Sequence, residues 1–242
     1  QSCVDRIGSY IPVPVNVADW RRDNLALLQA VTALFVPSHD MAQRLGRILD
    51  RPVLVREHAT DPALITALRA APTAPRPRTD GPIRHIGLLG AMGMSKGARL
   101  LFNTAREAIR LGLPLRFTVI GYTVRDDLFA DLPNVTITGP YPSQEVLDHI
   151  ARTAPDLIWL PSVWPETFCF TLTETMAAGV MPVVFDLGAQ AQRLRETGWG
   201  QVMPRALMSD PAGAAQYLAT CPITPPPEGA RASLIRDFPG IG

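Results

Sequence analysis

The segment PSVWPETFCFTLTETMAAGVMPVVFD, residues 161–186, carries two glutamates, Glu166 and Glu174, eight positions apart. The pattern predicts that Glu166 lies on a loop after a strand, and that Glu174 lies in a helix that begins near Phe170 or Thr171. The unpaired N–H groups and the positive dipole end of such a helix start can hold a phosphate. The two acids on either side are therefore predicted to hold the hydroxyl groups of two different sugars, with a diphosphate between them.

A second set of residues with suitable chemistry lies in the glycine-rich stretch GLLGAMGMSKG, residues 87–97. All but one of the 23 basic residues are arginine, and the exception is Lys96 in this stretch. Gly90 would let the backbone approach a ligand closely, and Lys96 would offer phosphate a compact charge. Tyr122 and Tyr141 are candidates for stacking on a nucleobase. The plainer alternatives are a turn glycine, a solvated lysine, solvated glutamates and half-buried surface tyrosines.

The elements that must position these residues follow a regular order. Short apolar strand patterns alternate with amphipathic helix patterns, which predicts an α/β fold: a Rossmann-like, doubly wound parallel sheet covered on both faces. Ligands bind beyond the carboxyl ends of the strands in such a sheet. The expected strands are residues 84–90, 115–121, 134–140, 156–162 and 181–186, and the expected helices are 95–112, 143–153, 172–179 and 189–198.

The remainder of the chain sets the predicted domain boundaries. Residues 1–70 contain further helix and strand patterns, with Asp19 as an expected N-cap and Ser38 as another. Residues 71–82 are rich in proline and are predicted to be a linker. The sheet domain is expected over residues 83–215, and residues 216–242 are expected to form a weakly patterned tail.

The motifs together resemble those of glycosyltransferase family 4, retaining nucleotide-sugar enzymes of the GT-B fold. PSVWPETFCFTLTETMAAGVMPVVFDLG resembles the family's Glu-x7-Glu segment, IGLLGAMGMSKG its diphosphate loop, and VTITGPY its base-side strand and loop. The resemblance covers about residues 82–200, which correspond to the C-terminal, donor-binding half. Residues 19–62 are similar to the end of the acceptor-side domain, so residues 1–70 are interpreted as a remnant of it.

The resemblance implies a role for each site residue. Glu174 would bind the ribose, and Lys96 the diphosphate. Glu166 would bind the donor-sugar hydroxyls and is the catalytic candidate. The distal phosphate would be capped by the backbone amides of Phe168, Cys169, Phe170 and Thr171.

Two features depart from the family pattern. An arginine usually precedes the lysine, whereas residues 90–92 here are Gly-Ala-Met, and Cys169 stands where glycine is common. The missing arginine affects the expected strength of diphosphate binding. The cysteine affects the expected backbone conformation of the loop.

The implied function is retaining transfer of a sugar from a UDP- or GDP-linked donor to a glycan or lipid-linked acceptor. The implied enzyme is a hexosyltransferase of EC 2.4 in cell-surface polysaccharide synthesis. The acceptor would bind through an N-terminal domain that this chain lacks, so the chain alone is expected to be incomplete; Gln1 in place of Met agrees with a piece of a longer protein. No cofactor is expected.

Composition narrows the remaining classes. A formal net charge of +1 means that no strong positive electrostatic field would attract nucleic acid. No run of apolar residues is long enough to span a bilayer. No signal peptide is expected from the pattern of the first residues. We therefore expect a cytoplasmic protein with at most peripheral contact at the inner membrane face. The three cysteines and four histidines lack metal-ligand spacing, so no metal site is expected.

Two alternatives stay open at this point. A non-catalytic nucleotide-sugar binding module would keep the fold without turnover. An NAD-dependent oxidoreductase is suggested by the glycines after a strand, but their spacing is Gly-x-x-Gly-x-x-Gly, and the next strand ends at Gly121 and Tyr122 without the ribose-binding acid.

Overall fold

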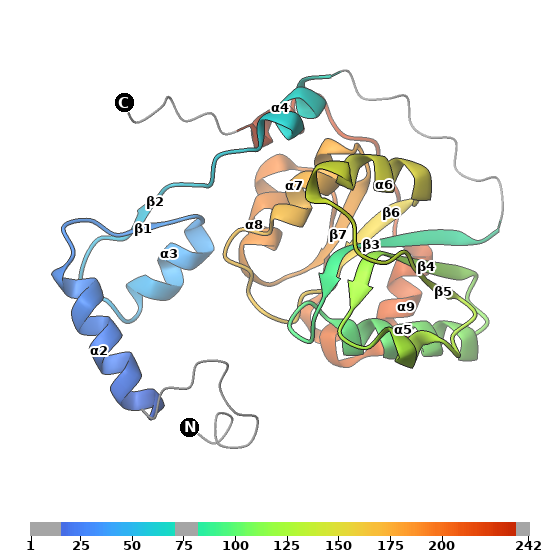
Figure 1. Cartoon of the computed structure of the whole chain (residues 1–242), viewed down its shortest axis with the longest axis horizontal. Helices are drawn as coiled ribbons and strands as arrows, with labels where there is room; N and C mark the ends of the chain where they lie inside the picture. Colours follow the sequence, from blue (N-terminus) through green and yellow to red (C-terminus); the bar gives the residue numbers. More distant parts are fainter. Residues whose placement is uncertain (1–15, 71–81, 236–242) are drawn as a thin grey trace. The chain divides into compact units, whose positions relative to one another are not determined.

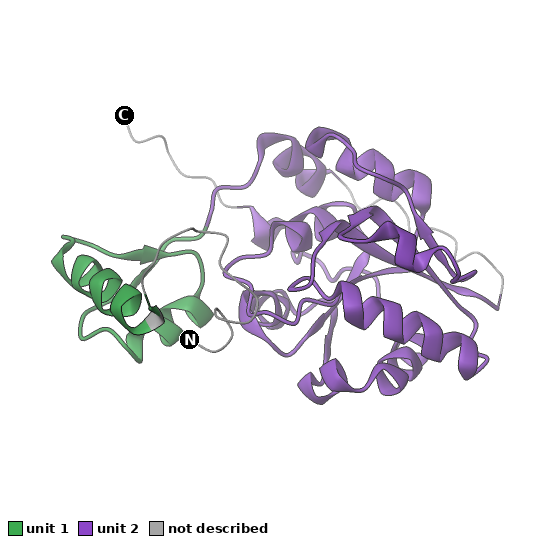
Figure 2. Ribbon diagram, turned by 60° about the horizontal axis from the view of Figure 1, so that its bottom comes forward, with its two compact units in different colours: residues 1–57 green, residues 58–242 purple. Residues whose placement is uncertain are grey.

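The computed structural model describes residues 16–70 and 82–235, and it divides into two compact units, residues 1–57 and 58–242 (Figure 2). All but the last residue of the predicted linker, residues 71–82, lies outside the described part. The first unit ends earlier than the expected boundary at residue 70. Helix α4, Pro62–Arg69, belongs to the second unit, because the Arg231 guanidinium donates to the carbonyl oxygens of Ala67 and Ala70.

The first unit has one small parallel pair of strands joined by a helix. Strand β1 pairs with β2 in parallel, Phe35 opposite Leu54. The expected cap at Ser38 is confirmed, since its hydroxyl accepts from the Met41 amide. Asp19 is not the N-cap of the first helix; Asn16 takes that role. The elements are α2 Val17–Ala30, β1 Phe35–Val36, α3 His39–Gly46 and β2 Leu54–Val55.

The second unit contains a six-stranded sheet among its described residues, in the order β5-β4-β3-β6-β7-β8, with every pair parallel. The predicted α/β class and Rossmann-like doubly wound sheet are therefore confirmed. The strands are β3 Arg84–Met92, β4 Leu115–Thr123, β5 Val135–Ile137, β6 Leu157–Leu160, β7 Met181–Phe185 and β8 Gln201–Met203. The helices are α5 Ala98–Arg110, α6 Val146–Thr153, α7 Phe170–Ala177, α8 Gly188–Thr197 and α9 Pro211–Thr220, with short 3-10 turns η1 Asp126–Phe129, η2 Ser143–Glu145, η3 Arg205–Ser209 and η4 Ala232–Leu234.

Helices cover both faces of this sheet. Helices α5 and α9 pack together on one face, and α6 and α7 lie on the other (Figure 1). Every residue of β6 and β7 is buried, and the rings of Trp159 and Phe185 meet inside the core with centroids 6.1 Å apart. Burial on both faces explains why these strands appear in the sequence as continuous apolar runs rather than alternating ones.

The C-terminal part differs from the sequence expectation. Strand β8 and helix α9 were not predicted, and residues up to Leu234 pack into the second unit rather than forming a separate tail. Leu218 is fully buried, and the Arg84 guanidinium donates to the carbonyl oxygens of Leu218 and Cys221, each at 2.8 Å. A three-residue strand is too short to show a period, and an alanine-rich helix such as α9 has little contrast between an apolar and a polar face, which explains the omission.

A buried histidine lies near the amino end of the sheet. Arg116 donates to Nδ1 of His85 at 3.0 Å, so that nitrogen accepts, and Nε2 then carries the hydrogen that is shared with the Thr118 hydroxyl at 2.8 Å. His85 is only 4% exposed. Burial lowers its pKa to about 4; the Arg116 cation adds to this and the Asp156 carboxylate opposes it. The imidazole is therefore neutral in the folded protein at neutral pH.

This histidine gives the stability a pH dependence. Its ordinary pKa is 6.5 and its folded pKa is about 4, so between these values the unfolded chain binds a proton that the folded chain does not. Its contribution is complete above pH 6.5 and is lost as pH falls toward 4. We expect the free energy of unfolding, from urea titrations at several pH values, to fall more steeply across this window in wild type than in His85→Gln, which cannot titrate. Parallel pH profiles for the two proteins would contradict this.

Candidate functional site

The candidate site lies where the strand order of the parallel sheet reverses. Strand β3 is flanked by β4 on one side and β6 on the other, so successive strands run outward from the β3–β6 boundary in opposite directions. The loops after β3 and β6 both emerge at the carboxyl ends of these strands. Such a switch point is where doubly wound sheets bind their ligands. It is also where the sequence placed Lys96 and Glu166.

Hydrogen bonds to one carbonyl join these two loops. The carbonyl of Ser95 accepts from the hydroxyl of Ser162 at 3.1 Å and from the amide of Val163 at 3.0 Å. Gly97 completes the junction with φ of +90°, and a Cβ there would lie 2.2 Å from the Pro161 carbonyl oxygen. A side chain at position 97 is therefore excluded both by conformation and by space.

The junction brings Lys96 and Glu166 into contact. Lys96 Nζ lies 2.6 Å from Glu166 Oε1, and the exposed fractions of the two side chains are 41% and 15%. The sequence assigned one residue to phosphate and the other to sugar hydroxyls. Their proximity means that a ligand contacting both must share or separate an existing ion pair.

Helix α7 begins at Phe170, as the sequence predicted. Its N-cap is Cys169, whose backbone is in the left-handed region with φ of +70° and ψ of +81°. Among the backbone hydrogen bonds of the described residues, none uses the amides of Cys169, Phe170 or Thr171 as donors. Three donors at a helix N-terminus are therefore available to an anion.

Helix α8 holds the same loop from behind. The Ala189 amide donates to the Glu166 carbonyl at 2.9 Å. The Arg193 guanidinium donates through Nη1 to the carbonyl oxygens of Phe168 and Cys169, at 2.9 and 3.0 Å. Arg193 and Ser162 could not be predicted as site residues, because an arginine on a predicted helix and a serine after a strand belong to no recognisable motif.

A cavity of about 220 Å³ opens beside the start of α7. It brings together five of the predicted residues. They are Gly90, Tyr122, Tyr141, Thr171 and Glu174.

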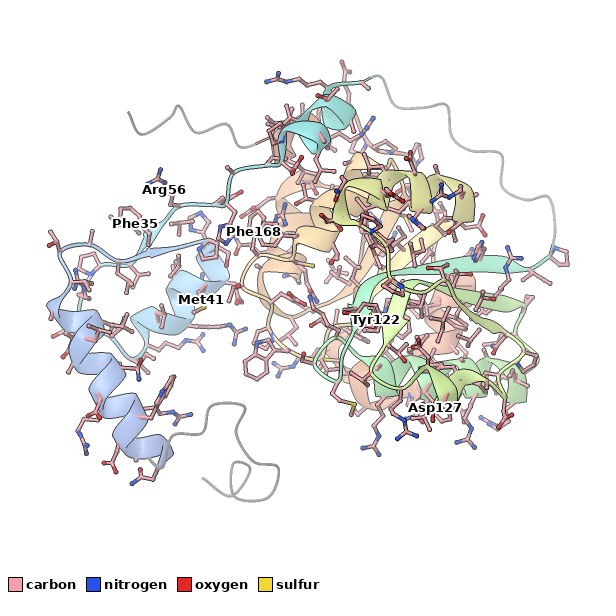
Figure 3. The ribbon with its side chains drawn as sticks, viewed as in Figure 1. Phe35, Met41, Arg56, Tyr122, Asp127 and Phe168 are labelled. Atoms are coloured by element: carbon pink, nitrogen blue, oxygen red, sulfur yellow. The ribbon has the colours of Figure 1, made fainter. Side chains whose placement is uncertain are left out.

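The other predicted residues lie outside this lining. Lys96 and Glu166 form the ion pair on the adjacent loops. The side chains of Phe168 (labelled in Figure 3) and Cys169 are buried, whereas that of Phe170 is exposed. The rings of Phe168 and Phe170 contact each other and also His58, with centroids 5.0 to 5.1 Å apart.

Burial shifts the titration of the acid and the tyrosine that line the cavity. Burial raises the pKa of Glu174; Lys96 opposes the shift, and the Asp61 carboxylate adds to it. Burial, together with the Glu174 charge, raises the pKa of Tyr141 to about 12. The Tyr141 ring also stacks on His149 at 4.7 Å, which fixes its plane. Tyr141 therefore stays a protonated phenol and a hydrogen-bond donor at neutral pH.

Cys169 has the features of a packing residue. Its thiol is buried, and burial first, then the Glu166 charge, raise its pKa, so the nucleophilic thiolate is disfavoured. Its Sγ lies 3.4 Å from the Thr171 hydroxyl. The buried thiol is therefore a packing group rather than a nucleophile.

Two observations concern metals and membranes. Within residues 16–70 and 82–235, no group of three or more histidine, cysteine or carboxylate side chains is arranged to hold a metal ion. In the same ranges no helix combines the length and apolar character needed to cross a membrane.

Comparison with known families identifies the second unit. A family model described as glycosyl transferases group 1 matches residues 83–220. The chain belongs to this family. The matched residues contain the β3 and β6 loops, the cavity and helix α8, so the geometry described above is that of a glycosyltransferase family domain. No curated protein matches the sequence significantly.

Solved structures share the fold at low identity. HepE of Anabaena, solved with UDP and glucose, aligns with a TM-score of 0.59 and 16% identity over 85% of this chain and 58% of its own. Sucrose-phosphate synthase of Thermosynechococcus elongatus gives 0.59 and 14%, over 95% and 60%. A TarM variant of S. aureus, solved with fondaparinux, alpha-GlcNAc-glycerol and UDP, gives 0.61 and 13%, over 86% and 42%. The sheet is that of the Rossmann-like domains of GT-B glycosyltransferases, and the chain spans 42% to 60% of these three proteins.

The left-handed turn at Cys169 predicts an unusual stability order. A residue with a Cβ costs about 1–2 kcal/mol in this region, whereas glycine loses only about 0.4–1 kcal/mol through its freer unfolded chain. We therefore expect Cys169→Gly to be more stable than Cys169→Ala by about 1 kcal/mol. Ala151→Gly, at an exposed position in helix α6, should show the opposite order and lose about 1 kcal/mol. Urea unfolding of the four proteins measures both, and a less stable glycine at position 169 would contradict the assigned turn.

Proposed function

We propose that residues 58–235 form the donor-binding half of a glycosyltransferase that takes its sugar from a nucleoside-diphosphate sugar. The observation that carries the proposal is the position of three unused amides at the start of α7, with Lys96 and Glu166 paired on the loops that meet at the same switch point. The family match supports the reaction class. UDP bound in HepE and in TarM supports a nucleotide donor.

Each part of the donor has a matching group. The cavity beside Tyr122 and Tyr141 accepts the nucleobase, and the Glu174 carboxylate accepts hydrogen bonds from the ribose hydroxyls. Lys96 and the amides at the start of α7 neutralise the diphosphate, so we propose that donor binding requires no divalent metal. Glu166 accepts hydrogen bonds from the donor-sugar hydroxyls and is the proposed catalytic residue.

The finer assignments extend this proposal. Residues 161–188 and 86–97 resemble the Glu-x7-Glu segment and the diphosphate loop of glycosyltransferase family 4. From this resemblance we propose that the protein is a member of that family, that it retains the anomeric configuration, and that its donor is a hexose linked to UDP or GDP. The acceptor is a glycan or lipid-linked sugar in cell-surface polysaccharide synthesis, bound through an N-terminal domain of which residues 1–57, the first compact unit, are a remnant. The site of action is the cytoplasm, with at most peripheral contact at the inner face of the membrane.

A non-catalytic nucleotide-sugar binding module is the alternative, and one observation favours it. Residues 90–92 of the diphosphate loop supply no arginine, which leaves Lys96 as the only side-chain cation of that loop, residues 87–97, and its charge is already matched by Glu166. Donor hydrolysis and transfer by the protein with its complete acceptor domain separate the two functions. A dehydrogenase is less well supported, because Tyr122 occupies the end of β4 where a ribose-binding acid would be needed.

The first test concerns Lys96. A charge-assisted contact with phosphate contributes about 1.5–3 kcal/mol, so Lys96→Ala should weaken binding of UDP or GDP about ten- to a hundredfold. Uridine or guanosine should bind almost unchanged, because their contacts are with Glu174 and the cavity. Calorimetric titration of both proteins with each nucleoside and its diphosphate measures this.

Two controls accompany these titrations. Lys96→Arg should restore part of the affinity, since a planar fork replaces a compact charge. All titrations are run in EDTA and repeated with magnesium. Equal losses for nucleoside and diphosphate would remove Lys96 from the site, and binding that appears only with magnesium would contradict the metal-free proposal.

The second test concerns the ion pair. Glu166→Gln releases Lys96 from a carboxylate 2.6 Å away and removes a negative charge near the diphosphate. A partly exposed pair contributes about 0–1 kcal/mol, so UDP or GDP should bind up to about fivefold more tightly to this variant. The matching nucleotide sugar should gain less, because glutamine accepts hydrogen bonds from hydroxyl groups more weakly than a carboxylate. A larger gain for the nucleotide sugar than for the diphosphate would place Glu166 away from the sugar.

A further inference from the structure

Arg193 is a buried cation directly behind the start of α7. The residue is 5% exposed, and its Nη2 donates to the Thr173 hydroxyl at 2.7 Å in addition to the two carbonyl contacts of Nη1. The centre of its guanidinium lies 4.1 Å from the centroid of the Phe168 ring. Three hydrogen bonds and a ring contact thus fix the guanidinium against residues 168–173 in one orientation.

The two carbonyl contacts hold the neighbouring peptide units in one orientation. The Cys169 carbonyl also accepts from the Leu172 amide at 3.2 Å, whereas the Phe168 carbonyl accepts from Arg193. Every described peptide bond is trans, and in a trans peptide unit the C=O and the following N–H point in opposite directions. The Phe168 carbonyl faces Arg193, so the Cys169 amide is directed away from it. The Cys169 carbonyl likewise directs the Phe170 amide away. These are two of the three amides that have no acceptor among the described residues.

The same contacts also transmit charge. A cation bonded to a carbonyl polarises its peptide unit and makes the N–H on the far side a stronger donor. The carbonyls of Phe168 and Cys169 each connect the Arg193 guanidinium to one outward amide. Positive potential therefore reaches the outward side of the loop although the guanidinium itself is buried.

We infer that Arg193 is a positioning residue of the diphosphate site, which orients and polarises the Cys169 and Phe170 amides that bind the distal phosphate. Residues 90–92 provide no arginine to the diphosphate loop, and Arg193 provides a second cation instead, bound to the carbonyl side of residues 168 and 169. The inference rests on the proposed function. It goes beyond it by assigning phosphate affinity to a side chain that never touches the ligand.

The experiment compares three variants of the full chain. Arg193→Met removes the charge and the fork, and Arg193→Lys keeps the charge without the fork. Arg195→Met is the matched control, because it removes an arginine two residues along α8 that is 55% exposed and pairs with Asp186 at 2.7 Å. Each protein is titrated with UDP and uridine, and with GDP and guanosine.

If the Cys169 and Phe170 amides lose their orientation, at least one charge-assisted hydrogen bond to the phosphate is lost. Arg193→Met should therefore weaken binding of UDP or GDP about ten- to a hundredfold. Its nucleoside affinity should stay within about twofold, Arg193→Lys should fall between wild type and Arg193→Met, and Arg195→Met should match wild type. Equal losses for nucleoside and diphosphate would reduce Arg193 to a structural role and overturn the inference. So would full affinity in Arg193→Met, or in Arg193→Lys. If wild type binds neither UDP nor GDP, the proposed function is wrong, and so is this inference, which depends on it.

If Arg193→Met does not fold, a measurement on wild type tests whether the Cys169 and Phe170 amides bind the diphosphate. Hydrogen exchange of the Cys169 and Phe170 amides is followed with each diphosphate and with the corresponding nucleoside at saturation. The bound diphosphate should slow exchange of both amides, and the nucleoside should not. Unchanged exchange with a diphosphate that titration shows to be bound would overturn the assignment of these amides.

Discussion

The close approach of two backbones at Gly97 and Pro161 is the constraint on which the site depends. It lets the loop after β3 lie directly against the loop after β6, with the Ser95 carbonyl shared between Ser162 and Val163. Without this approach, the two loops would lie further apart, and Lys96 and Glu166 would not be in contact. A Cβ at position 97 would have to displace the Pro161 carbonyl and therefore the whole junction.

Helix α8 provides the second support, and it acts on backbone rather than on side chains. Its first turn holds the Glu166 carbonyl, and a Cβ at Gly188 would lie 2.7 Å from the Glu166 nitrogen. Arg193, one turn further along, holds the carbonyls of Phe168 and Cys169. The loop that carries the catalytic candidate is thus fixed by the strand–helix unit that follows it in the chain. An interior this closely packed leaves the loop few alternative conformations.

The sequence predicted the features that depend on short-range chemistry. Strand and helix alternation predicted the parallel sheet, and the start of α7 at Phe170 was predicted because an apolar helical run follows a loop that contains a proline. The N-cap of the first helix was misassigned to Asp19 instead of Asn16, since both residues cap well and lie three apart. Arg193 could not be found this way. Its role depends on a contact over some 25 residues, and in a chain whose basic residues are nearly all arginine its type carries no information.

The ion pair between Lys96 and Glu166 has a consequence for the speed of recognition. A lone lysine at the mouth of a site would attract an anionic ligand from a distance and raise its association rate. Here a carboxylate 2.6 Å away turns the exposed charge into a local dipole, whose field falls off much faster with distance. Association should then proceed at the unassisted rate of about 10⁵–10⁷ M⁻¹s⁻¹ and depend little on ionic strength. Discrimination between ligands is left to the dissociation step, after the phosphate has met the amides and displaced the glutamate from its lysine.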